Sequence, residues 1–226
     1  MTIKALVFDF DGLILDTEGP IYQSWRELFQ SYGYELTLDD WQICIGSAEG
    51  TASFFDNLTD KMVNPLDRDA EAPMRLEREL ELIANQPILP GVKAYLQRAA
   101  ELGLKMGIAS SSPCKWVLDH LQERGLRGYF KCILAADDVG ITKPDPDLYL
   151  TALDCLGVSA HQAIAFEDSP NGVLAAKRAG MYCVAVTNPV TRQLRIDEAD
   201  LQLGSLAEMS LDELLVKVEG LHQGIQ

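Results

Sequence analysis

The chain has 226 residues, of which 47% are hydrophobic and 23% charged, with a formal net charge of −15. These proportions are typical of soluble globular proteins and exclude disorder of the whole chain. No apolar run approaches the roughly 18–20 residues of a membrane span, and a strongly acidic chain is poorly suited to bind nucleic acid. The N-terminus lacks the features of a signal peptide, so we expect a cytoplasmic protein without membrane or nucleic-acid partners.

Short apolar runs recur along the chain and predict the strands of a buried parallel sheet. They lie at residues 3–8, 105–109, 132–135, 163–166 and 182–186. Helical patterns lie between the later runs, at about 91–102, 113–124, 146–156 and 171–179, each followed by glycine. Strands that alternate with helices of this length predict an α/β fold with a doubly wound (Rossmann-like) parallel sheet.

Residues 17–86 interrupt this alternation without a convincing strand, and they predict a helical insert. Five apolar residues fall on one face of a helix, namely Ile21, Trp25, Leu28, Phe29 and Tyr32. Residues 70–84, rich in Glu, Arg and Leu, predict a second helix. We therefore expect a helical cap domain, 17–86, over an α/β core domain made of 1–16 and 87–226. A self-contained core and cap favour a monomer.

The cysteines and histidines predict neither a disulfide framework nor a zinc site. The five cysteines are widely spread and form no C-x-x-C pair, and the three histidines share no short metal-ligand spacing. We expect most of the cysteines to be small core residues.

Polar side chains follow four of the predicted strands, where an open parallel sheet binds its ligands. They are Asp9 and Asp11, Ser110 to Ser112, Lys143, and the pair Glu167 and Asp168. Alone, each has an ordinary explanation as a turn former, a helix cap or an exposed lysine. Their occurrence together at four strand ends is not explained in that way and predicts an active site.

These residue types suit phosphoryl transfer. A carboxylate can act as a nucleophile and form an aspartyl phosphate, which divides a difficult hydrolysis into two steps. Several carboxylates favour Mg²⁺, which prefers hard oxygen ligands. A lysine supplies a compact positive charge for phosphate oxygens, and hydroxyl and N–H groups at a helix start can bind the others. We expect a small phosphomonoester as the substrate.

Four ordered motifs resemble those of the haloacid dehalogenase superfamily, in its branch with a small helical cap. They are the segments 9–17 (DFDGLILDT), 109–112 (ASSS), 142–147 (TKPDPD) and 166–172 (FEDSPNG). That branch includes β-phosphoglucomutase and sugar-phosphate phosphatases. The resemblance covers the chain from about residue 3 to residue 186 and implies a Mg²⁺-dependent enzyme.

The resemblance also implies residue roles. Asp9 would be the nucleophile and a metal ligand, and Asp11 the proton shuttle, with its backbone carbonyl on the metal. Ser110, Ser111 and Lys143 would bind the transferring phosphoryl group. Asp168 would be a metal ligand, and Glu167 either a further ligand or a partner of one. Aliphatic dehalogenases of the superfamily lack the equivalent of Asp11, so the resemblance implies phosphatase chemistry.

Two departures from the mutase pattern favour hydrolysis. Ile21 stands where the mutase has a cap histidine, and residues 46–49 (GSAE) replace a segment that carries an arginine there. A phosphosugar mutase nevertheless stays the main alternative, and a receiver-like phosphoacceptor protein stays a non-enzymatic one. Arg75 and Arg78 could contact a substrate from the cap, although solvated helix charges are the more common explanation. We expect Trp25 and Phe29 to belong to the core of the cap.

Overall fold

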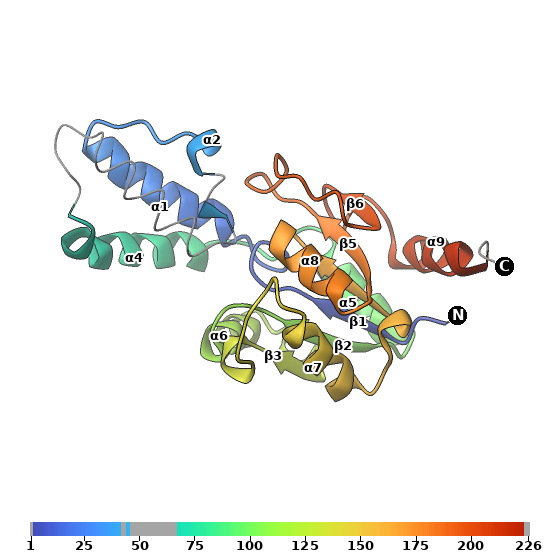
Figure 1. The fold of residues 1–226 in the computed structure, drawn as a ribbon. Helices are drawn as coiled ribbons and strands as arrows, with labels where there is room; N and C mark the ends of the chain where they lie inside the picture. The colour runs from blue at the N-terminus through green and yellow to red at the C-terminus, as the bar shows by residue number, and fades with distance from the viewer. Residues whose placement is uncertain (1, 42–43, 46–66, 224–226) are drawn as a thin grey trace.

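The computed structural model describes residues 2–41, 44–45 and 67–223 (Figure 1). Within them, six strands form one sheet. They are β1 (Ala5–Phe8), β2 (Lys105–Ala109), β3 (Cys132–Leu134), β4 (Ala163–Glu167), β5 (Tyr182–Val186) and β6 (Leu201–Leu203). The strand order is β3-β2-β1-β4-β5-β6, and every neighbouring pair is parallel. The predicted α/β class with a parallel sheet is confirmed.

Helices cover both faces of this sheet (Figure 1). The helices α5 (Val92–Glu101), α6 (Cys114–Glu123) and α9 (Leu211–Gln223) contribute to the core on one face. The helices α7 (Asp147–Leu156) and α8 (Pro170–Arg178) cover the other face. Three short 3₁₀ segments lie at Arg127–Tyr129, Ala136–Asp138 and Ala160–Gln162. The four helices predicted between the strands lie within one or two residues of their expected bounds.

The pleat of β1 divides its side chains between the two layers of the core. Leu6 and Phe8 face α5, α6 and α9, whereas Ala5 and Val7 face α7 and α8. All four side chains are fully buried. A strand buried on both faces explains why its sequence is continuously apolar rather than alternating. Because β1 is at the centre of the sheet, the residue that follows it lies in the middle of the ligand-binding edge.

The insert between β1 and β2 is helical. It contains α1 (Glu18–Ser31), α2 (Leu38–Trp41) and α4 (Arg68–Ala84), and α1 and α4 lie side by side away from the sheet (Figure 1). Phe29 is buried in a cluster against which Trp25 packs, as expected for the core of a cap. The residues of the predicted cap motif 46–49 lie outside the described residues.

Three features were not predicted from the sequence. The strand β6 and the helix α9 extend the fold beyond Val186, where the predicted elements end. Cys132 of β3 and Cys155 of α7 form a disulfide, which corrects the expectation that no cysteines pair. The packing of α7 on β3 brings residues 23 positions apart to a Cα–Cα distance of 6.4 Å, which spacing along the chain does not reveal.

The other cysteines largely agree with the expectation of core residues. Cys44 and Cys183 are buried, whereas Cys114 is only half-buried. Among the described residues, no helix is both long enough and apolar enough to cross a bilayer.

Candidate active site

An ion pair connects the ends of three segments at the carboxyl edge of the sheet. Asp9 directly follows β1, and its backbone N–H donates to the carbonyl of Phe166 in β4 at 2.9 Å. The Lys143 ammonium, from the loop before α7, lies 2.5 Å from Oδ1 of Asp9 and 2.6 Å from Oε1 of Glu167. All three side chains are buried, with at most 9% of each exposed. The lysine is thus fixed between two of the predicted site carboxylates.

Glu167 is held tightly by its surroundings. The hydroxyl of Tyr149, on α7, donates to its Oε1 at 2.5 Å, and Oε2 is buried without a hydrogen-bond partner. A Cβ atom on Gly172, in the first turn of α8, would lie only 1.8 Å from that Oε2. The glycine therefore makes room for the carboxylate. The contact with Tyr149 was not predicted, because this residue occupies an ordinary apolar position of α7.

Asp9, Glu167 and Asp168 form a cluster that fits a divalent cation. One carboxylate oxygen from each lies within 4.8 Å of the others, and all three residues are buried. The pKa of Asp9 is raised to about 8, chiefly by burial; Lys143 opposes this rise, and the charges of Glu167 and Asp11 contribute to it. Burial, followed by the charge of Asp9, also raises the pKa of Asp168 well above its usual range. Lys143 therefore does not offset the negative charge of the three carboxylates in full, and their hard oxygen donors suit Mg²⁺.

Lys143, unlike the buried aspartates, is stabilised in its charged form. Burial lowers its pKa, but the carboxylates of Asp9 and Glu167 outweigh that cost, so that the pKa is raised above its usual value. The side chain remains an ammonium at neutral pH and can receive phosphate oxygens as a point charge.

Asp11 lies beside this cluster and is held by donors from the other side of the site. Its Oδ2 accepts from the hydroxyls of Ser112 at 2.7 Å and Ser110 at 3.3 Å. Its Oδ1 accepts from the indole N–H of Trp116, on α6, at 2.9 Å. The ring of Trp116 in turn packs edge-on against His120, 4.2 Å away. Ser112 belonged to the predicted serine segment, but nothing in the sequence distinguished Trp116 from a core residue.

A cavity of about 580 Å³ opens over these side chains. Asp9, Asp11, Ser110, Ser111, Lys143 and Asp168 all line it, so that the structure brings these predicted residues together, and Glu167 lies just beneath through its contact with Lys143. The other described residues of the lining are Glu18, Ile45, Ser112, Thr142, Pro144, Ser169 and Asn171.

Asn188 is a site residue that the sequence analysis missed. Its side-chain amide donates to Oδ2 of Asp168 at 2.9 Å and to the carbonyl of Gly12 at 3.1 Å. It follows the carboxyl end of β5, and the rule that ligands bind beyond strand ends could have identified it. Asn188 connects the aspartate of the fourth strand to the loop after the first.

Glu18 is the second residue that was missed, and it comes from the cap. It begins α1 and lines the cavity. Burial first, and then the charges of Asp11, Asp16 and Glu79, together raise its pKa to about 7. A single glutamate at the start of a helix carries no sequence signal that would distinguish it from an ordinary solvated residue.

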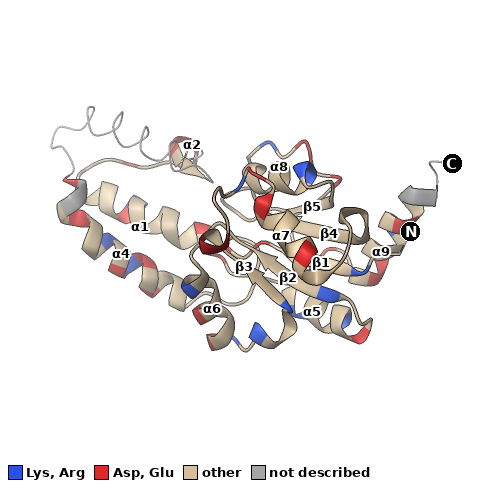
Figure 2. Cartoon of the chain, turned by 60° about the horizontal axis from the view of Figure 1, so that its bottom comes forward, with Lys and Arg blue, Asp and Glu red and all other residues tan. Residues whose placement is uncertain are grey.

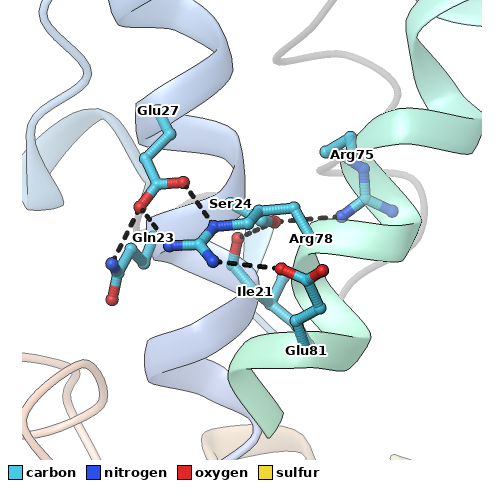
Figure 3. Close-up of polar contacts among 7 residues, drawn as sticks. All are labelled: Ile21, Gln23, Ser24, Glu27, Arg75, Arg78 and Glu81. Carbon is cyan, nitrogen blue, oxygen red and sulfur yellow. Dashed lines mark hydrogen bonds and ion pairs between the residues drawn. The ribbon is translucent and has the colours of Figure 1, made fainter.

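Arg75 and Arg78 do not line the cavity; both turn from α4 towards α1 (Figure 3). Arg78 pairs with Glu27 at 2.8 Å and with Glu81 at 3.2 Å. Arg75 donates to the Ser24 hydroxyl at 3.2 Å and also pairs with Glu79. Neither arginine therefore reaches the cavity, but they are not simply solvated helix charges either, because both are bound between α4 and α1 and Arg75 is only 14% exposed.

Comparison with known proteins agrees with this architecture. The family model of haloacid dehalogenase-like hydrolases matches residues 6–186. The chain is 48% identical over 213 residues to the candidate phosphatase YhcW of Bacillus subtilis (strain 168), covering 94% of this chain and 96% of that one. It is 32% identical over 217 residues to the phosphorylated carbohydrates phosphatase of Thermotoga maritima, covering 94% and 97%.

A solved structure resembles the whole molecule. The crystal structure of CbbY from Rhodobacter sphaeroides in complex with phosphate has a TM-score of 0.74 and 29% identity, covering 94% of this chain and 99% of that one. The likeness extends over both the sheet and the helical insert.

Proposed function

Because the chain belongs to the haloacid dehalogenase-like hydrolase family, we propose that it is a phosphatase that cleaves a small phosphorylated carbohydrate or similar phosphomonoester. The observation that carries the proposal is the ion pair of Asp9 with Lys143 inside the acidic cluster, at the floor of a cavity. A nucleophile, a phosphate-binding cation and a candidate metal site thus lie together. The names of the relatives, a candidate phosphatase and a phosphorylated carbohydrates phosphatase, support the same substrate class.

In the first step, the Asp9 carboxylate attacks phosphorus and the ester oxygen leaves. Lys143 holds a phosphoryl oxygen and orients Asp9, and the hydroxyls of Ser110 and Ser111 bind further oxygens. Protonated Asp11 donates a proton to the departing alkoxide, which makes an alcohol a sufficient leaving group. The product of the step is a phosphate ester of Asp9 and a free alcohol.

In the second step, water cleaves the aspartyl phosphate. Asp11, now a carboxylate, accepts a proton from the water as the water attacks phosphorus, and Asp9 is released. The same residue therefore serves as acid and then as base. Its donors Ser112 and Trp116 keep the carboxylate at the edge of the cavity, where both the alcohol and the water pass.

We assign the Mg²⁺ site to Asp9, Asp168 and Glu167, with the backbone carbonyl of Asp11 as a further ligand. The cation would offset the charge that accumulates between the carboxylates and the phosphate. The orphaned Oε2 of Glu167 and the raised pKa values of Asp9 and Asp168 fit such a cation.

Hydrolysis is favoured over a mutase reaction by the cap. Ile21 replaces the histidine of the mutase pattern, and Arg75 and Arg78 are occupied in packing α4 on α1.

We propose the cap as residues 17–86 and the core as 1–16 and 87–226. We also propose that the chain acts as a monomer.

The first prediction tests the nucleophile and the metal together. With Mg²⁺ and a panel of phosphorylated sugars, the wild type should release inorganic phosphate, and Asp9→Asn should lose at least about 10³-fold in kcat because an amide neither attacks nor balances Lys143. EDTA should silence the wild type and Mg²⁺ should restore it.

Circular dichroism and thermal unfolding provide the control, since Asp9→Asn should remain folded. Phosphate release by that variant, or full activity in EDTA, would contradict the mechanism. If phosphorus NMR showed that β-glucose 1-phosphate is converted to the 6-phosphate without release of free phosphate, the enzyme would be a mutase instead.

A further inference from the structure

The charge of the active-site cavity is unevenly distributed. Among the described residues that line it, Lys143 is the only cation, against the four acids Asp9, Asp11, Glu18 and Asp168. Lys143 already forms ion pairs with Asp9 and Glu167, on the side of the cavity formed by the sheet. Mg²⁺ at the proposed site would act on that same side. Above the pKa of Glu18, about 7, the cap side of the cavity therefore carries a negative charge without a cation of its own among the described lining.

The start of α1 fixes the position of Glu18. The Asp16 carboxylate accepts from the backbone N–H of Gly19 at 2.9 Å, which closes a turn around residue 18. A Cβ atom on Gly19 would lie 2.8 Å from Oδ2 of Asp16, so that the glycine permits this turn. The preceding residue, Thr17, is buried. The backbone of Glu18 is thus held at the junction between core and cap, with its side chain at the cavity.

The cap arginine Arg75 is already engaged in other contacts. Its guanidinium lies 4.5 Å from the centre of the Trp25 ring and pairs with Glu79. It also donates a hydrogen bond to the Ser24 hydroxyl (Figure 3). Glu79 itself contributes to the negative field at Glu18. In the sequence of residues 46–66, which lie outside the described part of the chain, Lys61 is the single basic residue.

We propose that Glu18 is a specificity-determining residue that selects phosphomonoesters with an uncharged, hydroxyl-rich leaving group and rejects those with a second negative charge. A carboxylate accepts hydrogen bonds from hydroxyl groups, whereas an anionic group placed opposite it is repelled. The neutral polar side chains of Ser111, Thr142 and Asn171 line the same cavity and suit hydroxyls. This inference rests on the proposed phosphatase function and narrows its substrate class.

The test uses two substrates with one carbon skeleton. Glycerol 1-phosphate and 3-phosphoglycerate differ in a CH₂OH group against a carboxylate, and p-nitrophenyl phosphate serves as a reference. At about pH 8, above the pKa of Glu18, the wild type with Mg²⁺ should prefer glycerol 1-phosphate over 3-phosphoglycerate by about 30-fold or more in kcat/KM, the size expected for like charges brought together. In Glu18→Gln, this preference should fall to about 3-fold, chiefly through a lower KM for the carboxylate substrate.

Glu77→Gln is the matched control, because Glu77 is an exposed glutamate of α4 that does not line the cavity. It should keep the wild-type preference. An unchanged preference in Glu18→Gln, or a wild type that prefers 3-phosphoglycerate, would overturn the inference while leaving a phosphatase. Failure of the wild type to cleave any of the esters, including p-nitrophenyl phosphate, would instead overturn the proposed function.

Discussion

Glu167 can occupy its position only because Gly172 has no Cβ atom. The missing Cβ leaves space for a carboxylate that is also held by Tyr149 and Lys143. Gly172→Ala should push Glu167 out of this arrangement. We expect a loss of about 1–3 kcal/mol in the free energy of unfolding, typical of overpacked sites, and a fall of about tenfold or more in kcat/KM.

Denaturant unfolding and phosphate release measure the two effects. Gly128→Ala is the control, because an added Cβ there meets nothing within 4 Å and the backbone is not in the left-handed region. It should change neither quantity appreciably. If Gly172→Ala kept both stability and activity, Glu167 would be freer than its contacts indicate.

At the same scale, the residues that sequence could predict are those with a positional signal. Asp9, Ser110, Lys143 and Asp168 follow strands or belong to recognisable motifs, so that the cavity lining could be predicted before its geometry was known. Trp116 and Tyr149 carry no such signal. Each occupies a helix position where an aromatic residue normally packs, and only tertiary structure directs the indole N–H to Asp11 and the hydroxyl to Glu167.

At the scale of elements, long periodic segments were predictable and short or cross-linked ones were not. The strand β6 has three residues with an exposed glutamine at its centre, too short for a pattern, and it depends on pairing with β5. The disulfide between β3 and α7 depends on the packing of two elements that are separate in sequence. Such features follow from the assembled sheet rather than from local propensity.

That disulfide should stabilise the fold without affecting catalysis. It closes a loop with a sequence separation of 23, for which loop-closure entropy suggests about 3 kcal/mol. Cys155 is exposed, so that serine itself costs little there. Cys155→Ser should therefore lower the free energy of unfolding by about 2–3 kcal/mol under oxidising conditions and leave kcat within about twofold.

Urea unfolding with and without dithiothreitol checks this prediction. In the reductant, the wild type should fall to the stability of the variant, and Cys114→Ser, at a free cysteine of α6, should have no comparable effect. Equal stabilities under oxidising conditions would show that the bridge contributes nothing.

At the scale of the whole molecule, the net charge of −15 opposes the approach of a phosphate dianion. Acidic residues are distributed over the helices of both core and cap, with fewer basic residues among them (Figure 2). Productive binding instead depends on the short-range field of Lys143 and the proposed metal site. The long-range repulsion is screened by salt, because the Debye length shortens to about 8 Å at physiological ionic strength, whereas buried pairs are screened much less.

Raising NaCl from about 20 to 200 mM should therefore increase kcat/KM for a phosphomonoester by about 2–3-fold, through a lower KM, at constant Mg²⁺. Steady-state phosphate release measures the change, and an equivalent osmolality of sucrose should not reproduce it. The effect should persist in Glu18→Gln, since removing one charge leaves the net charge strongly negative. A decrease of kcat/KM with salt would mean that local cations, rather than the acidic surface as a whole, dominate the approach of the substrate.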